Sequence, residues 1–378
     1  MRIALVTQVF EPSDVTACPG INRYALGLAT ALVEEGIDVD VVTPWAPGLE
    51  RLGSWHGIKI RRLEDSKSVL GRTGVVGEAN VLSFDLNLGR QKQILSKIDV
   101  IQSDIPLNFT PKRWPSVALV GFVHHLYRVW RPLDVLTVPF GELYLGHMLH
   151  TADRIVTPST ATARDVIARY GIGADTIAII PHGFDRFLFR PASGPESRDG
   201  ARPQLAFIGL LETRKGIFDL PKILDRVRKR HPKASLKIVG TGPEETKLRS
   251  DFDAHGSATH VSFLGNVGDP ELVRILNASD VLLLPSRLEG FGFVAAEAMA
   301  CGKPVVAYDN PVSREVIGNA GVLVPDGDLV SFANAVSRLL EDREERNRIG
   351  TAARGQALDK FDWAVAARRY VELYQEVT

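Results

Sequence analysis

The sequence predicts an α/β protein with two successive domains, each a parallel β-sheet covered by helices. Short apolar runs alternate with stretches of helical periodicity in both halves of the chain. Strands that alternate with helices indicate right-handed crossovers and parallel sheets. The length of 378 residues exceeds what one ordinary hydrophobic core needs, so two cores are expected. The stretch 191–203, rich in Pro, Gly, Ser and charged residues, has the composition of a linker between them.

The first half begins with a strand, a loop, a helix and a second strand. Its expected strands are Ile3–Val6, Val39–Thr43, Val100–Gln102, Val117–Val123, Arg154–Thr157 and Ala178–Ile180. The segment Ala25–Glu35 is apolar at helical spacing and ends before Gly36, a residue suited to a helix C-terminus.

The second half repeats this plan without a tandem sequence repeat. Its expected strands are Leu205–Ile208, Leu236–Val239, Val261–Leu264, Val281–Leu284, Pro304–Ala307 and Gly321–Val324. A final helix, about Trp363–Glu376, has an apolar side that needs a surface to cover, and we expect it to cross back onto the first domain. The predicted domains are residues 1–190, joined by the C-terminal helix at about 362–378, and residues 191–361.

The composition argues against several classes of protein. Lys plus Arg number 45, as do Asp plus Glu, so no strong net charge indicates nucleic acid as a partner. The two cysteines, Cys18 and Cys301, suit reduced thiols in the cytoplasm. The apolar run Met1–Thr7 is too short for a signal peptide, and no segment approaches the roughly 20 apolar residues of a membrane-spanning helix. Any membrane contact is therefore expected to be peripheral.

The loops that follow the strands are where an open α/β sheet binds ligands. The most informative loop is 285–307, in which seven residues separate Glu289 from Glu297. Gly290 and Gly292 remove side chains from the path of a ligand, and a helix is expected to start directly after them. Amides at that helix start would face a phosphate, and the helix dipole would favour its charge. Without further context, two such carboxylates would more often flank an ordinary capped helix.

This stretch resembles the Glu-x7-Glu signature of the retaining GT-B glycosyltransferases of family GT4, including the Ala-x-Ala-Cys-Gly-x-Pro-Val turn that follows. The resemblance implies two facing Rossmann-like domains and a nucleotide-diphosphate sugar as the donor. It also implies that Glu289 contacts the transferred sugar and that Glu297 accepts the two ribose hydroxyls. The donor-binding residues that it implies in this loop are Glu289, Gly290, Phe291, Gly292, Phe293 and Glu297.

The loop after the first strand of the second domain, 207–217, carries the adjacent pair Arg214 and Lys215. Basic pairs are commonly solvated surface, but a guanidinium and an ammonium near a helix start could bind a diphosphate. The loop resembles the family's Gly-Arg-Leu-x-x-x-Lys-Gly motif, and Lys215 matches its lysine. Leu210 stands where many members carry the arginine, so Arg214 is the candidate to supply that charge. Both basic residues are predicted to bind the donor and to act in catalysis.

Two loops of the first domain carry weaker signals. Residues 11–24 resemble the family's Gly-Gly-x-x-Arg-Tyr entry into the first helix, with Gly20 matching the second glycine. Gly20 would let backbone amides approach the reacting phosphate or the acceptor. His124, at the end of the strand Val117–Val123, matches the catalytic-site histidine that the family places beside the transferred sugar. His125 adjoins it, so the choice between the two histidines stays open, as does a structural role.

Further matches to the family follow in order along nearly the whole chain. They are 152–162, 180–185 with His182 in place of asparagine, 240–244 and 263–267. Agreement in order across both halves is more specific than any one motif. The agreement is weakest at about 48–97.

Three Asp-x-Asp pairs have the spacing that bridges a divalent ion to a diphosphate in other sugar transferases. They are Asp38/Asp40, Asp251/Asp253 and Asp326/Asp328. None of the three lies at a strand end beside the other motifs, and the third has the pattern of a turn and helix cap. No Cys/His cluster has zinc spacing. We therefore expect no metal and no other cofactor, with fixed cations neutralising the leaving phosphate.

The resemblance predicts a retaining, metal-independent hexosyltransferase that uses a UDP- or GDP-sugar and a hydroxyl of a glycan, lipid-linked or small-molecule acceptor. Its mechanism would be front-face substitution, since nothing in the sequence identifies the carboxylate pair that double displacement needs. Two alternatives stay open: a nucleotide-sugar epimerase or pseudo-glycosyltransferase of this fold, and a non-catalytic nucleotide-sugar-binding subunit. Basic residues within 51–131 also leave open a peripheral contact with the inner face of a membrane. They include Lys59, Arg61, Arg62, Lys112 and Arg113.

Overall fold

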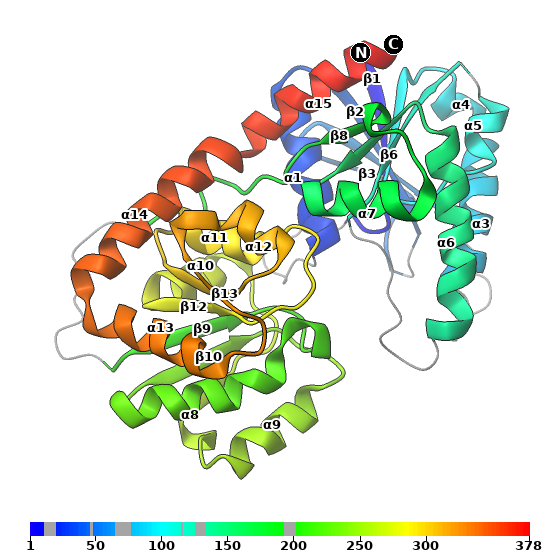
Figure 1. The fold of residues 1–378 in the computed structure, drawn as a ribbon. Helices are drawn as coiled ribbons and strands as arrows, with labels where there is room; N and C mark the ends of the chain where they lie inside the picture. Colours follow the sequence, from blue (N-terminus) through cyan, green and yellow to red (C-terminus); the bar gives the residue numbers. More distant parts are fainter. Residues whose placement is uncertain (11–19, 46–47, 65–76, 115, 125–133, 193–201) are drawn as a thin grey trace. The chain divides into compact units, whose positions relative to one another are not determined.

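A computed structural model describes residues 1–10, 20–45, 48–64, 77–114, 116–124, 134–192 and 202–378 (Figure 1). The chain divides into two compact units. Unit 1 contains the described residues up to Gly183 together with Trp363–Thr378, and unit 2 contains those of Phe184–Asp362. The first domain was predicted to end at residue 190, whereas this part of unit 1 ends at Gly183. The structure divides the chain earlier, because the Phe184 amide donates to the Phe361 carbonyl at 2.7 Å within unit 2.

Unit 1 is built on an eight-stranded sheet with the order β3-β4-β2-β1-β5-β6-β7-β8. All neighbouring strands are parallel except β3 and β4, which form an antiparallel pair. The strands are β1 (Arg2–Val6), β2 (Asp38–Pro44), β3 (Leu52–Trp55), β4 (Ile58–Leu63), β5 (Val100–Ser103), β6 (Ala118–Phe122), β7 (Arg154–Thr157) and β8 (Ile177–Ile179). The six predicted strands are therefore present, and the hairpin of β3 and β4 was missed.

The missed hairpin lies at the edge of the sheet, where β3 alternates between exposed and partly buried residues and β4 exposes Lys59. Its turn is His56-Gly57, and both residues have positive φ, 47° and 83°. Ile58 and Ile60 are buried while Lys59 is exposed, which is the alternation of a half-buried strand. This alternation around a His-Gly turn is the signal that could have predicted the hairpin.

The helices of unit 1 are α1 (Gly20–Glu34), α3 (Gly77–Gly89), α4 (Lys92–Leu95), α5 (Thr110–Arg113), α6 (Asp134–Thr151), α7 (Thr160–Tyr170), η1 (Ala174–Thr176) and α15 (Trp363–Val377). The first helix begins at Gly20, earlier than the predicted Ala25. The C-terminal helix α15 belongs to unit 1 and lies along α1 (Figure 1). A Cβ atom on Gly27 would lie 2.1 Å from the Trp363 indole nitrogen, so only glycine fits this contact.

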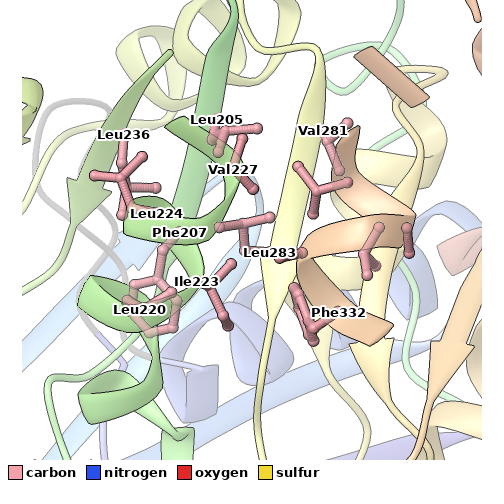
Figure 2. Packing of buried hydrophobic residues seen from close by; sticks show 14 of the residues in the cluster. Leu205, Phe207, Leu220, Ile223, Leu224, Val227, Leu236, Val281, Leu283 and Phe332 are labelled. Carbon is pink, nitrogen blue, oxygen red and sulfur yellow. The ribbon is translucent and has the colours of Figure 1, made fainter. Parts of the chain in front are cut away.

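Unit 2 is built on a six-stranded parallel sheet with the order β11-β10-β9-β12-β13-β14. Its strands are β9 (Gln204–Ile208), β10 (Ser235–Val239), β11 (Val261–Phe263), β12 (Val281–Leu284), β13 (Val305–Tyr308) and β14 (Val322–Val324). Each of them was predicted. Leu205 and Phe207 of β9, with Leu283 of β12, pack against helical residues such as Ile223 and Phe332 (Figure 2).

The helical segments of unit 2 are η2 (Thr213–Lys215), η3 (Ile217–Asp219), α8 (Leu220–Arg230), α9 (Glu245–Ala254), η4 (Ala258–His260), α10 (Asp269–Ala278), α11 (Phe293–Ala300), α12 (Pro311–Val316), η5 (Gly318–Ala320), α13 (Leu329–Glu341) and α14 (Arg343–Lys360).

The predicted fold class, two α/β domains with parallel sheets, is confirmed. Cys301 is buried and free, and Cys18 lies outside the described residues. Within the described ranges, no helix combines the length and apolarity needed to cross a membrane.

Candidate active site

The order of strands in unit 2 reverses at β9 and β12. From β9 the chain proceeds outward through β10 to β11, whereas β12, β13 and β14 extend from its other side. Parallel sheets bind ligands beyond the carboxyl ends of the strands at such a switch point. The loops after β9 and β12, which carry Lys215 and Glu289, both start there. Two loops that were predicted separately therefore belong to one site.

These two loops are in backbone contact. The Arg287 amide donates to the Arg214 carbonyl at 2.9 Å. Gly216 has a φ of 66°, and a Cβ atom on it would lie 1.8 Å from the Pro285 carbonyl oxygen. Only glycine permits both this left-handed conformation and this close approach.

We expect Gly216→Ala to destabilise unit 2 by about 3 kcal/mol or more, because a left-handed alanine and a backbone clash add their costs. Gly256→Ala is the matched control. Gly256 has a φ of 63° and nothing within 4 Å of its Cβ position, so this variant should lose only about 1–2 kcal/mol. Scanning calorimetry compares the two melting temperatures. Equal shifts would contradict the close contact at Gly216.

Lys215 and Glu289 form an ion pair across the two loops. The Lys215 Nζ donates to Glu289 Oε1 at 2.7 Å, and the two side chains are 16% and 7% exposed. Burial alone would raise the pKa of the Glu289 carboxyl. The charges of Lys215 and Arg214 outweigh that effect and hold the pKa below its usual value. Glu289 is therefore a carboxylate at neutral pH, beside the cation predicted to bind phosphate.

Arg214 lies next to this pair and has its own partner. Its Nε donates to Glu212 Oε2 at 2.9 Å, and both side chains are partly exposed. Leu210, at the family's arginine position, is exposed and offers no charge. Arg214 is thus placed in the loop where the missing charge is expected, held by a carboxylate.

The glycine-rich segment after β12 leads into α11. Gly292 is the N-cap of this helix with a φ of 87°, and it provides no side-chain cap. The Phe291 side chain is buried against Phe293 and Phe361, at centroid distances of 5.5 and 5.3 Å. A ligand could therefore contact only the backbone of Phe291. Glu297 lies one turn into α11 and is 1% exposed.

Arg287 is a residue of this site that the sequence analysis missed. Its guanidinium donates to Asp219 at 2.7 Å and pairs with Asp326 at 3.2 Å. The Tyr308 hydroxyl also donates to Asp219, at 2.9 Å. These contacts join the loops after β9, β12 and β14 to the last residue of β13. No sequence motif indicates them, because they depend on the order of strands in the sheet.

Two of the three Asp-x-Asp pairs have other partners in the structure. Asp326 pairs with Arg287, and Asp328 caps α13 by accepting from two amides. Asp38 and Asp40 both lie within ion-pair distance of Arg2. Asp251 and Asp253 are on α9. Across the described ranges, no group of three or more His, Cys, Asp or Glu side chains could hold a metal ion.

Unit 1 has a second cluster at the carboxyl ends of its strands. His124 follows β6 and lies 3.5 Å, Nε2 to Oδ2, from Asp104, which follows β5. His182, which follows β8, is buried with its ring 5.6 Å from that of His124. His125 lies outside the described residues. Gly20 is the exposed first residue of α1 and directly follows another stretch outside them.

Two family models match adjoining parts of the chain. The model of Glycosyltransferase Family 4 matches residues 19–186, and that of Glycosyl transferases group 1 matches residues 192–356. The chain belongs to glycosyltransferase family GT4. Its two α/β domains with parallel sheets are those of the GT-B fold that the Glu-x7-Glu resemblance implied.

Curated relatives agree with this assignment. The chain is 31% identical to a glycogen synthase of Mycobacterium tuberculosis over 60% of its own length and 55% of that protein, so the match spans about half of this relative. It is 28% identical to a D-inositol 3-phosphate glycosyltransferase of Paenarthrobacter aurescens, covering 99% of this chain and 97% of that one.

Two solved structures share the fold over the whole chain. Sucrose-phosphate synthase from Thermosynechococcus elongatus superimposes with a TM-score of 0.85 at 22% identity, covering 100% of this chain and 98% of that chain. HepE from Anabaena, solved in complex with UDP-glucose, superimposes with a TM-score of 0.76 at 20% identity, covering 100% of each chain.

Proposed function

We propose that this GT4 glycosyltransferase transfers a hexosyl unit from a UDP- or GDP-sugar to a hydroxyl acceptor, with retention at the anomeric carbon and without a metal ion. The observation that carries the proposal is the Lys215–Glu289 pair at the switch point of unit 2, with Arg214 beside it. Adjacent cations suit a diphosphate, and a fixed carboxylate suits sugar hydroxyls. A site that binds a nucleotide sugar needs both the cations and the carboxylate.

Each part of the site has a separate task in this proposal. Lys215, Arg214 and the first amides of α11 neutralise the diphosphate as it leaves, and Glu289 aligns the sugar. Glu297 accepts the ribose hydroxyls. A donor phosphate oxygen takes the proton of the incoming hydroxyl while the bond from the anomeric carbon to the phosphate oxygen breaks. The new glycosidic bond forms on the same face.

The ion pair explains how the cation is kept in place before the donor arrives. With Glu289 as its partner, Lys215 does not leave a positive charge buried without compensation. Binding of a diphosphate would supply a second anion to Lys215 and free Glu289 to accept sugar hydroxyls. A UDP-sugar donor is supported by one solved neighbour, which holds UDP-glucose, and a small-molecule acceptor is supported by a relative named D-inositol 3-phosphate glycosyltransferase.

A panel of nucleotide sugars tests the proposal, with thermal shift for binding and release of nucleoside diphosphate for turnover. The expected result is one preferred donor whose turnover rises when an acceptor is added. Epimer formation, or donor consumption indifferent to any acceptor, would favour the epimerase alternative. A protein that only supports the activity of a partner, and does so equally well after Lys215→Met, would favour the non-catalytic binding subunit.

Activity should survive EDTA, because fixed cations are proposed to supply the electrostatic stabilisation. The measurement is turnover of the preferred donor before and after chelation and dialysis. A rate within about twofold of the untreated enzyme is expected. A strict need for Mg²⁺ or Mn²⁺, restored on adding the ion back, would contradict the proposed mechanism.

Peripheral membrane contact stays a prediction. Among the basic residues that suggested it, Lys59 and Arg61 lie 3.6 and 3.8 Å from Asp38 and Asp40. The Arg62 guanidinium donates to the Glu50 carbonyl. The carboxylates beside Lys59 and Arg61 reduce the charge that β4 offers to an anionic surface.

A further inference from the structure

The cluster of unit 1 contains a buried carboxylate that faces the predicted catalytic histidine. The Asp104 side chain is fully buried, and its Oδ2 lies 3.5 Å from His124 Nε2. The Thr7 hydroxyl donates to the same carboxylate at 2.8 Å, and the Gln8 amide donates at 3.1 Å. Three strand ends, those of β1, β5 and β6, are joined through this one carboxylate.

His124 is the only basic side chain within 4 Å of the Asp104 carboxylate, as far as the described residues show. Its Nε2 is buried and makes no hydrogen bond to any of them. The distance of 3.5 Å is longer than a hydrogen bond. Catalytic hydrogen bonds are often long in ligand-free structures and shorten when substrate binds.

The rings around His124 offer no competing charge. Tyr24 and Phe122 contact it edge to face, at centroid distances of 5.0 and 4.6 Å. Burial lowers the pKa of His182 far below its usual value, so His182 stays neutral. Burial likewise raises the pKa of Tyr24, which remains a phenol. Among the described residues, Asp104 is therefore the ionisable group that faces Nε2 of the His124 ring.

We infer that Asp104 is a positioning residue that holds a proton on Nε2 of His124 and fixes its ring for contact with a substrate hydroxyl. The role of His124 toward a hydroxyl rests on the proposed function, whereas the pairing rests on geometry alone. With Nε2 protonated toward the carboxylate, the neutral ring keeps Nδ1 as its hydrogen-bond acceptor. The family motifs described above assign no role to Asp104.

The tautomer of His124 can be measured whether or not the chain proves to be a transferase. The experiment is a long-range 1H–15N correlation on the full chain labelled with 15N-histidine. The His124 ring is assigned by its disappearance in His124→Gln. We expect a protonated Nε2 in the unsubstituted protein, and a shift to the other tautomer or to a mixture in Asp104→Asn. A bare Nε2 with the proton on Nδ1 in the unsubstituted protein would overturn the inference.

A double-mutant cycle tests whether Asp104 acts through His124. Asp104→Asn should lower kcat/KM by about tenfold or more, the worth of a charge-assisted hydrogen bond. It should cause little further loss in a His124→Gln background. Asp104→Glu should recover part of the activity. Equal losses in both backgrounds would show that Asp104 does not act through His124 and would overturn the inference.

Asp99→Asn is the matched control for this cycle. Asp99 directly precedes β5, whereas Asp104 directly follows it. The Asp99 carboxylate accepts a hydrogen bond from the Arg2 amide at 2.7 Å. It should leave both kcat/KM and the His124 tautomer unchanged. If the unsubstituted protein turns over no nucleotide sugar, the proposed function is wrong. The measured tautomer of His124 would still show whether Asp104 pairs with its ring.

Discussion

Replacing Lys215 with methionine should lower kcat/KM for the nucleotide sugar by about 100-fold, because a charge-assisted bond to the diphosphate is worth up to about 3 kcal/mol. Arg214→Ala should cost less, since Glu212 already holds that guanidinium. The two changes together should remove most activity. Initial rates of nucleoside diphosphate release provide the comparison. Unchanged turnover in the double variant would rule out the phosphate site.

A second effect of Lys215→Met must be separated from the first. Glu289 would remain buried without its cation, and such a charge destabilises a protein by a few kcal/mol. The melting temperature should therefore fall in Lys215→Met and recover in Lys215→Met/Glu289→Gln. Turnover should stay low in both. If turnover recovers together with the melting temperature, Lys215 serves only to fold the loop.

The two glutamates should fail in different ways. Glu297→Ala should weaken binding of the free nucleoside diphosphate by about tenfold or more, because the ribose contact exists whether or not a sugar is attached. Glu289→Ala should leave that binding nearly intact and lower kcat by about 100-fold, because its contact aligns the anomeric carbon in the transition state. Calorimetric titration and steady-state kinetics measure the two effects.

Folding must be checked before either result is interpreted, since both residues flank the start of α11. Circular dichroism and the melting temperature should match those of the unsubstituted protein. The reverse pattern, with Glu289→Ala weakening nucleotide binding, would exchange the two assignments. Two neutral substitutions in folded protein would mean that the motif is structural.

The interior strands could be predicted from the sequence because both of their faces are buried. β9 and β12 read as continuous apolar runs, and each was predicted within a residue or two. The edge hairpin of β3 and β4 was missed because its burial alternates and the strands are short. The start of α1 was placed too late, since Gly20 and the polar Asn22 and Arg23 precede its apolar stripe.

The candidate site was predictable only as separate loops. Lys215 and Glu289 were each predicted from their own motif, but 74 positions separate them and their pairing follows from the adjacency of β9 and β12. Arg287 and Asp104 were not predicted at all. Their partners come from several different strand ends, so nothing in the neighbouring sequence distinguishes them from other charged residues.

Calorimetric titration of UDP and of GDP into the full chain tests the central claim most directly. One of the two should bind with a Kd in about the micromolar range, a value typical of nucleotide sites that release product. Its affinity should fall at least about tenfold in Lys215→Met. No binding of either nucleotide to the folded protein, or equal affinity in the variant, would contradict a nucleotide-sugar site in unit 2.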